Sequence, residues 1–152
     1  MNHTQRPFAM KQTLILAFAL LFTASAFAAD VNEKVLKNFK ETFSTAENVH
    51  WQEYKEFFSV SFMQSGMRTT VNYDKKGNMI GSLRYYEPQM LPLNIINQLK
   101  KDYPKKSLFG VTEISYGSDI NYYVKLQDEK TWITVKVDPT GENSVVEKFS
   151  KL

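Results

Sequence analysis

The sequence predicts an α+β fold in which a unit of one helix and four strands occurs twice, and three observations support it. Two short amphipathic stretches, at residues 30–43 and 91–104, have the spacing of helices. Each is followed by four short runs that alternate apolar and polar residues, as strands do. The two halves also align with each other at nearly constant offsets. We therefore expect an antiparallel sheet of up to eight strands with both helices on one face.

The first 28 residues have the features of a signal peptide. A basic region precedes Thr13–Phe22, an apolar run of ten residues, and Ala26-Phe27-Ala28 then gives the small-x-small pattern that a signal peptidase recognises. A membrane-spanning helix needs about 20 apolar residues, so we expect cleavage near Ala28 rather than an anchor. The pattern is complete from Met10, so translation can start at Met1 or Met10. The expected location is periplasmic or secreted.

Removing the signal peptide leaves a nearly neutral chain. The full sequence has 19 Lys and Arg and 16 Asp and Glu. Two of the basic residues and none of the acidic ones lie in residues 1–28, so the net charge falls from +3 to +1. This balance gives no support for nucleic-acid binding. We predict one domain over residues 29–152, made of repeats at about 30–87 and 90–152, because a unit of about 60 residues makes a marginal core.

The first helix is expected to begin at Asp30, which can cap it, with Glu33 three residues later as in a capping box. The second is expected within Leu91–Pro104, where Pro92 suits the first turn and Pro104 ends the helix. The apolar stripes of the two helices match at an offset of 60, in the pairs Leu36 and Ile96, Phe39 and Leu99, and Phe43 and Tyr103.

Four strand-like runs follow each helix. From the second run onward, the halves align at an offset of 64. Asp74 and Gly77 then match Asp138 and Gly141, and both pairs are typical of tight hairpin turns with glycine at a positive φ. The predicted strands are approximately Asn48–Tyr54, Phe57–Gln64, Met67–Asp74, Asn78–Tyr86, Gly110–Tyr116, Ile120–Gln127, Thr131–Asp138 and Glu142–Ser150.

The alternation within these strands separates a helix-covered face from an open one. The open face carries small hydroxyls, cations and large aromatic residues. Such a surface is compatible with an ordinary half-exposed sheet, but aromatic residues and arginine are also enriched in protein interfaces. The candidate partner-binding residues are Phe57, Arg68, Tyr123 and Trp132, with Trp51 as an anchor whose facing the pattern leaves open.

These motifs together resemble the PepSY-like family of exported proteins from Bacteroidetes. The resemblance rests on Val49-x-Trp51, on Leu91-Pro92 leading to Tyr103-Pro104, and on the two Asp-x-x-Gly turns. It implies a fold similar to that of the beta-lactamase inhibitory protein and no established catalytic residues. By analogy with that inhibitor, the open sheet face would hold a partner. The present chain lacks the inhibitor's disulfides, which argues against beta-lactamase itself as the target.

Few residues could support catalysis or metal binding. After residue 28 the chain has one histidine, His50, and no cysteine, which excludes Cys/His nucleophilic pairs and multi-histidine or thiolate metal sites. We interpret His50 as a surface or interface residue. We expect no enzyme activity, no cofactor and no metal.

Two further functions stay open besides a protein- or peptide-binding module with a partner in the cell envelope. One is a small-ligand carrier or enzyme with a cavity between the helices and the sheet. The other is self-association through an exposed sheet edge. The residues expected to line the cavity are Phe43, Phe62, Tyr73 and Tyr103.

Overall fold

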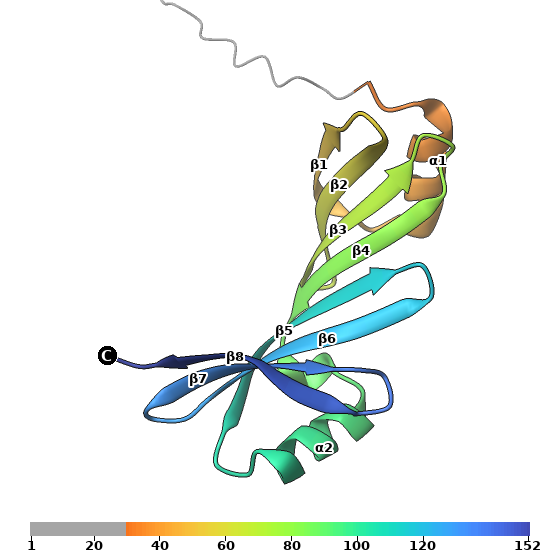
Figure 1. The fold of residues 1–152 in the computed structure, drawn as a ribbon. Helices are drawn as coiled ribbons and strands as arrows, with labels where there is room; N and C mark the ends of the chain where they lie inside the picture. The colour runs from red at the N-terminus through yellow and green to blue at the C-terminus, as the bar shows by residue number, and fades with distance from the viewer. Residues whose placement is uncertain (1–29) are drawn as a thin grey trace, which may run out of the picture.

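The structure is a computed structural model, and it describes residues 30–152 (Figure 1). The predicted signal peptide lies outside the described residues. The strands form one eight-stranded antiparallel sheet in which they follow one another in sequence order. This confirms the predicted α+β fold with a duplicated helix-plus-four-strands unit. The elements are α1 (Glu33–Thr42), β1 (Glu47–Glu53), β2 (Phe57–Gln64), β3 (Met67–Asp74), β4 (Met79–Tyr86), a short 3-10 turn (Pro88–Met90), α2 (Leu93–Asp102), β5 (Ser107–Tyr116), β6 (Asp119–Gln127), β7 (Thr131–Val137) and β8 (Asn143–Ser150).

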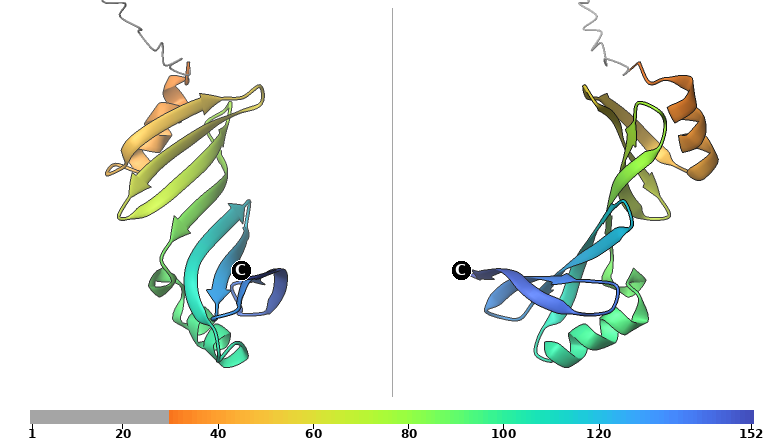
Figure 2. Two further views of the ribbon diagram at one scale, coloured as in Figure 1. Left: turned by 90° about the vertical axis from the view of Figure 1, so that its left-hand side faces the viewer. Right: turned by 45° about the vertical axis from the view of Figure 1, so that its right-hand side comes forward.

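Both helices cover the same face of the sheet. Residues directly opposite each other in antiparallel strands point to the same side. Thr69 is opposite Arg84, Arg84 is opposite Glu113, and Glu113 is opposite Tyr122. Thr69 and Tyr122 are both buried, one in each half. The right view of Figure 2 shows α1 and α2 on one side of the twisted sheet, as predicted.

Helix α1 packs on β1–β3 through an aromatic core. It begins after Asn32, whose side chain accepts a hydrogen bond from the Val35 amide at 3.0 Å. Asn32 is therefore the cap, and the prediction that Asp30 caps the helix was wrong. The Phe62 ring lies 5.2 Å from Phe39, between ring centroids. The buried residues of this first core are Val31, Val35, Phe39, Phe43, Phe58, Val60, Phe62, Val71 and Tyr73.

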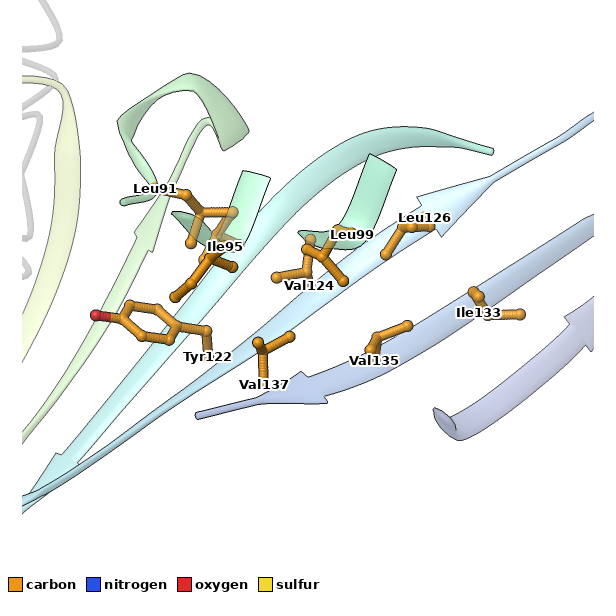
Figure 3. Packing of buried hydrophobic residues seen from close by; sticks show 10 residues of the cluster. Leu91, Ile95, Leu99, Tyr122, Val124, Leu126, Ile133, Val135 and Val137 are labelled. Atoms are coloured by element: carbon orange, nitrogen blue, oxygen red, sulfur yellow. The ribbon is translucent and has the colours of Figure 1, made fainter. Parts of the chain in front are cut away.

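Helix α2 packs on β5–β7 through a largely aliphatic core (Figure 3). Its bounds are those of α1 shifted by 60 residues, which confirms the predicted offset. Pro92 occupies the capping position and provides no side-chain hydrogen bond. The buried residues of this second core are Leu91, Ile95, Leu99, Val111, Tyr122, Val124, Leu126, Ile133, Val135 and Val137.

The two predicted Asp-x-x-Gly turns close the β3–β4 and β7–β8 hairpins. The Gly77 amide donates to the Asp74 carbonyl at 3.0 Å, and the Gly141 amide donates to the Asp138 carbonyl at 3.0 Å. Both glycines have positive φ, 90° and 95°. The Asp74 carboxylate accepts a hydrogen bond from the Asn78 side chain, and the Asp138 carboxylate accepts one from the Thr140 hydroxyl. These side-chain hydrogen bonds, together with those from backbone amides of the turn, lower the pKa values of both carboxylates.

The two halves join where β4 pairs with β5, over residues Gly81–Tyr86 and Val111–Tyr116. A polar cluster lies there on the helix-covered face. The Tyr86 hydroxyl donates to Glu113 at 2.7 Å, and Arg84 lies 3.5 Å from the same carboxylate. Burial is the main cause that raises the pKa of Tyr86, and the hydrogen bond to Glu113 raises it further.

The four residues expected to line a cavity under the helices do not lie together. Phe43, Phe62 and Tyr73 belong to the first core, where the Phe43 and Phe62 ring centroids are 4.8 Å apart. Tyr103 packs against the second core, and its hydroxyl donates to Asn143 at 3.0 Å. The expectation of one shared cavity was wrong, because the residues under α1 and those under α2 form two separate cores.

Candidate functional site on the open sheet face

Neither helix of residues 30–152 covers the opposite face of the sheet, and one row of side chains crosses it. The left view of Figure 2 looks onto this side of the molecule. Each residue of the row is directly opposite the next one in the neighbouring strand, so all of them point to the same side. From β2 to β7 the row consists of Met63, Arg68, Tyr85, Thr112, Tyr123 and Lys136.

A hollow of about 860 Å³ lies over the middle of this row. Arg68 and Lys125 supply cations to its wall, and Glu87 supplies a carboxylate. Tyr85 and Tyr123 add two phenol rings, and the side chain of Tyr85 is exposed. The hollow therefore combines apolar surface with positive charge, a combination that suits a partner with both apolar and acidic groups.

An aromatic cluster adjoins the hollow over β5, β7 and β8. Phe109 lies in a bulge of β5, so that it is the extra residue between the pairs formed by Leu108 and Gly110. Its ring meets Trp132 edge-on, with 4.7 Å between ring centroids. Phe149 is directly opposite Trp132. Phe109 and Phe149 are each more than half exposed, at 54% and 53%.

The predicted site residues are distributed unevenly over this face. Arg68 and Tyr123 both line the hollow. Trp132 contacts Phe109, and Phe109 also lines the hollow. Arg68, Tyr123 and Trp132, all three predicted, therefore lie on one continuous surface. Phe57 lies on the open face but stacks on Tyr54 at the far end of β2, with 4.5 Å between ring centroids. The strand length between them puts Phe57 about 20 Å from Arg68.

Trp51 lies on the other side of the sheet. It is directly opposite Val60, a buried core residue, and so points toward α1. Its ring meets Phe39 edge-on, with 5.2 Å between centroids. Trp51 therefore packs against the first core and does not share a surface with the other four candidates.

Tyr85 and Phe109 were missing from the predicted set. Alternation could not have identified Tyr85, because Leu83 shares its parity whereas the polar Arg84 is on the helix-covered face. Only pairing with Arg68 places Tyr85 on the open face. Phe109 could not be found from alternation either. It precedes the predicted start of its strand at Gly110, and its orientation depends on a bulge that pairing with β6 creates.

The one histidine of residues 30–152, His50, is exposed on the edge strand β1. Within residues 30–152, no group of three His, Cys, Asp or Glu side chains is arranged to hold a metal ion. No helix in the same residues is long and apolar enough to span a membrane.

Solved structures share this fold at low sequence identity. No protein-family model matches the chain, and no curated protein matches it significantly. A DUF2874 family protein from Bacteroides uniformis is 18% identical, with a TM-score of 0.58 over 78% of this chain and 88% of that chain. A BLIP-like protein from Bacteroides fragilis is 12% identical, with a TM-score of 0.58 over 78% and 85%. A protein from Bacteroides eggerthii, provisionally described as periplasmic, is 15% identical, with a TM-score of 0.58 over 79% and 88%.

At these identities the likeness establishes the fold alone. The predicted similarity to the fold of the beta-lactamase inhibitory protein is confirmed, since one of these structures is described as BLIP-like. None of the three descriptions carries the PepSY-like name.

Proposed function

We propose that this protein is an exported, non-enzymatic module that binds a protein or peptide of the cell envelope through its open sheet face. The hollow over β3–β6 is the observation that carries this proposal. Arg68 and Tyr123 are 55 positions apart in the sequence, and both line this hollow, which neither α1 nor α2 covers. We also propose that the chain belongs with the PepSY-like exported proteins.

Export is supported by two independent observations. The first 28 residues have the pattern of a signal peptide. A protein of the same fold from Bacteroides eggerthii is provisionally assigned to the periplasm.

The chemistry of the hollow favours a partner that combines an acidic group with an apolar one. Tyr85 and Tyr123 provide rigid, amphipathic contact area of the kind found at interface hot spots. Arg68 and Lys125 lie beside these rings, where they can pair with carboxylates. The Phe109–Trp132 pair extends the apolar part of this surface.

Photo-crosslinking in the source cells tests this proposal. A photoreactive phenylalanine analogue is placed at Tyr85, in the hollow, or at Leu93, which is 75% exposed on α2. We expect a crosslinked partner from position 85 and none from position 93. That partner, once purified, should bind the mature chain with about tenfold lower affinity when Arg68→Ala and Tyr85→Ala are combined, as for loss of an interface hot spot.

The matched control replaces one exposed cation and one exposed apolar residue on the helix side, Lys40→Ala with Leu93→Ala. This variant should keep full affinity. Equal capture from both crosslinking positions, or equal affinity of both double variants, would rule out the open face as the binding surface.

A further inference from the structure

A second cavity, of about 890 Å³, lies outside the open-face hollow. It is formed by the residues that lead into β5, the β6–β7 hairpin, and the end of β8 with the residue that follows it. The carboxylates of Asp128 and Glu129 line this cavity. Five lysines also line it: Lys105, Lys106, Lys130, Lys148 and Lys151. None of the residues named for the proposed function lines this cavity, but one of its lysines, Lys151, lies over the Trp132 ring.

Two of the lysines are held in place. The Lys106 ammonium group pairs with Asp128 and donates to the Thr131 hydroxyl at 2.6 Å. The Lys151 ammonium group donates to Gln127 at 2.8 Å and lies 4.6 Å from the centre of the Trp132 ring. Each ammonium group has three donors, so both retain at least one for a ligand.

The Asp128 carboxylate is already occupied by the protein. Besides Lys106, it accepts hydrogen bonds from the backbone amides of Lys130 and Thr131, at 2.8 and 2.7 Å. The hydrogen bond from Lys106 has the largest effect on the pKa of Asp128, and the hydrogen bond from the Lys130 amide has the next largest. Together they hold this pKa well below its usual range. This carboxylate therefore organises the hairpin and stays ionised, so that Asp128 and Glu129 together offset two of the five lysine charges and leave the cavity a net charge of +3.

The positive charge is concentrated at this end of the molecule. Residues 30–152 carry a net charge of only +1, since 17 Lys and Arg face 16 Asp and Glu. The cavity alone combines five lysines with two carboxylates. Lys105, Lys130 and Lys148 make no ion pair within the described residues. Like charges within about 10 Å repel one another, and a bound anion would relieve this repulsion.

We propose that this cavity is an anion site that binds a ligand carrying phosphate groups. Lys106 and Lys151 provide ammonium groups that are held in place. Lys105, Lys130 and Lys148 are exposed and would contact the anion from the solvent side. Lysine binds phosphate as a compact point charge, without the planar geometry that arginine imposes. The site can therefore take a phosphate in a range of orientations, either free or on a lipid headgroup.

Calorimetric titration of the mature chain with inorganic pyrophosphate tests the site. We expect saturable binding of one equivalent. Combining Lys130→Gln with Lys148→Gln should lower the affinity by about tenfold or more, because two charges beside the anion are lost. The matched control, Lys40→Gln with Lys76→Gln, removes two exposed lysines elsewhere and should bind like the wild type.

Thermal unfolding separates a binding defect from a folding defect. The Lys130→Gln/Lys148→Gln variant should unfold at the same temperature as the wild type or higher, because it relieves repulsion between lysines. Equal losses of pyrophosphate affinity in both double variants would mean general charge attraction, and the proposed site would be wrong.

Co-sedimentation with vesicles identifies the source of the phosphate. Vesicles of phosphatidylcholine with phosphatidylglycerol are compared with vesicles of phosphatidylcholine alone. Binding to the anionic vesicles that depends on Lys130 and Lys148 would assign the site to a lipid headgroup, whereas binding of pyrophosphate alone would assign it to a soluble phosphate. If the wild type binds neither probe, the cavity is not a phosphate site. The two substituted lysines do not line the open-face hollow, so this result does not decide the proposed function.

Discussion

At the scale of single residues, Tyr73 is an exception in an otherwise apolar core. Its side chain is 2% exposed, and its hydroxyl has no hydrogen-bond partner among residues 30–152. A buried polar group without a partner costs about 1–3 kcal/mol. Tyr73→Phe should therefore raise the free energy of unfolding by about 1 kcal/mol, as measured by urea denaturation.

Tyr103 provides the matched control in the other half. Its hydroxyl donates to Asn143 at 3.0 Å, so Tyr103→Phe removes a hydrogen bond and should lower the free energy of unfolding by about 1 kcal/mol. Equal destabilisation by the two substitutions would show that the Tyr73 hydroxyl contributes a favourable contact.

Tyr73 also makes stability depend on pH in the alkaline range. Burial raises its pKa from 10.0 to about 12 in the folded protein. The unfolded chain then loses this proton first, so the stabilisation is complete below pH 10 and is lost as the pH rises toward 12. The slope contributed by one such group is at most about 1.4 kcal/mol per pH unit.

The prediction is that the unfolding free energy of the wild type falls more steeply above pH 10 than that of Tyr73→Phe. Urea denaturation at several alkaline pH values measures both slopes. Tyr86, whose pKa is also raised, lowers the unfolding free energy of both proteins equally as the pH rises. Parallel profiles would contradict the assignment to Tyr73.

At the scale of elements, the two halves repeat the same helix and turn with different neighbours. Gly77 and Gly141 occupy equivalent turn positions with nearly the same positive φ. A Cβ atom at Gly77 would lie 3.2 Å from the Lys34 side chain and 3.3 Å from that of Asn38. A Cβ atom at Gly141 would meet only Gln98, at an ordinary 3.6 Å.

Substitution of these two glycines should therefore have unequal effects. Both alanine variants pay about 1–2 kcal/mol for the backbone conformation. Gly77→Ala must also displace side chains of α1, including Asn38, which donates to the Gly77 carbonyl at 2.8 Å. We expect Gly77→Ala to be the more destabilising, by about 1 kcal/mol, and thermal or urea unfolding of both variants measures the difference. Equal losses would mean that α1 adjusts without cost.

At the scale of the whole molecule, two separate cores share one sheet. The first core lies under α1 and the second under α2, and they have no buried residue in common. A core of this size is marginal by itself. The pairing of β4 with β5 and the Glu113 cluster connect the halves. We therefore expect the halves to unfold in one cooperative transition.

The two tryptophans make this prediction measurable, because Trp51 lies in the first half and Trp132 in the second. In a variant that keeps only Trp51, fluorescence reports the unfolding of the first half. In a variant that keeps only Trp132, it reports the unfolding of the second half. Leu126→Ala, in the second core, should cost about 2–5 kcal/mol and shift the urea midpoint of both reporters equally. A shift seen only by Trp132 would show that the halves unfold independently.

Much of this architecture could be read from local patterns. The bounds of β2 and β3 and the two Asp-x-x-Gly turns were predicted correctly, because alternation and turn chemistry involve residues within a few positions of one another. The offset of 60 between the helices was visible for the same reason. The cap of α1 was misplaced by two residues, from Asn32 to Asp30, because either side chain can accept from a helix amide.

The surfaces depended on contacts between residues far apart in the sequence. Register with β2 turns Trp51 toward α1, and a bulge against β6 turns Phe109 toward the open face. The hollow needs five separate segments of the chain to meet, and the lysine cavity needs three. Periodicity identifies which residues share a face of one element. Only pairing across the sheet, together with its twist, decides which faces of different elements form one surface.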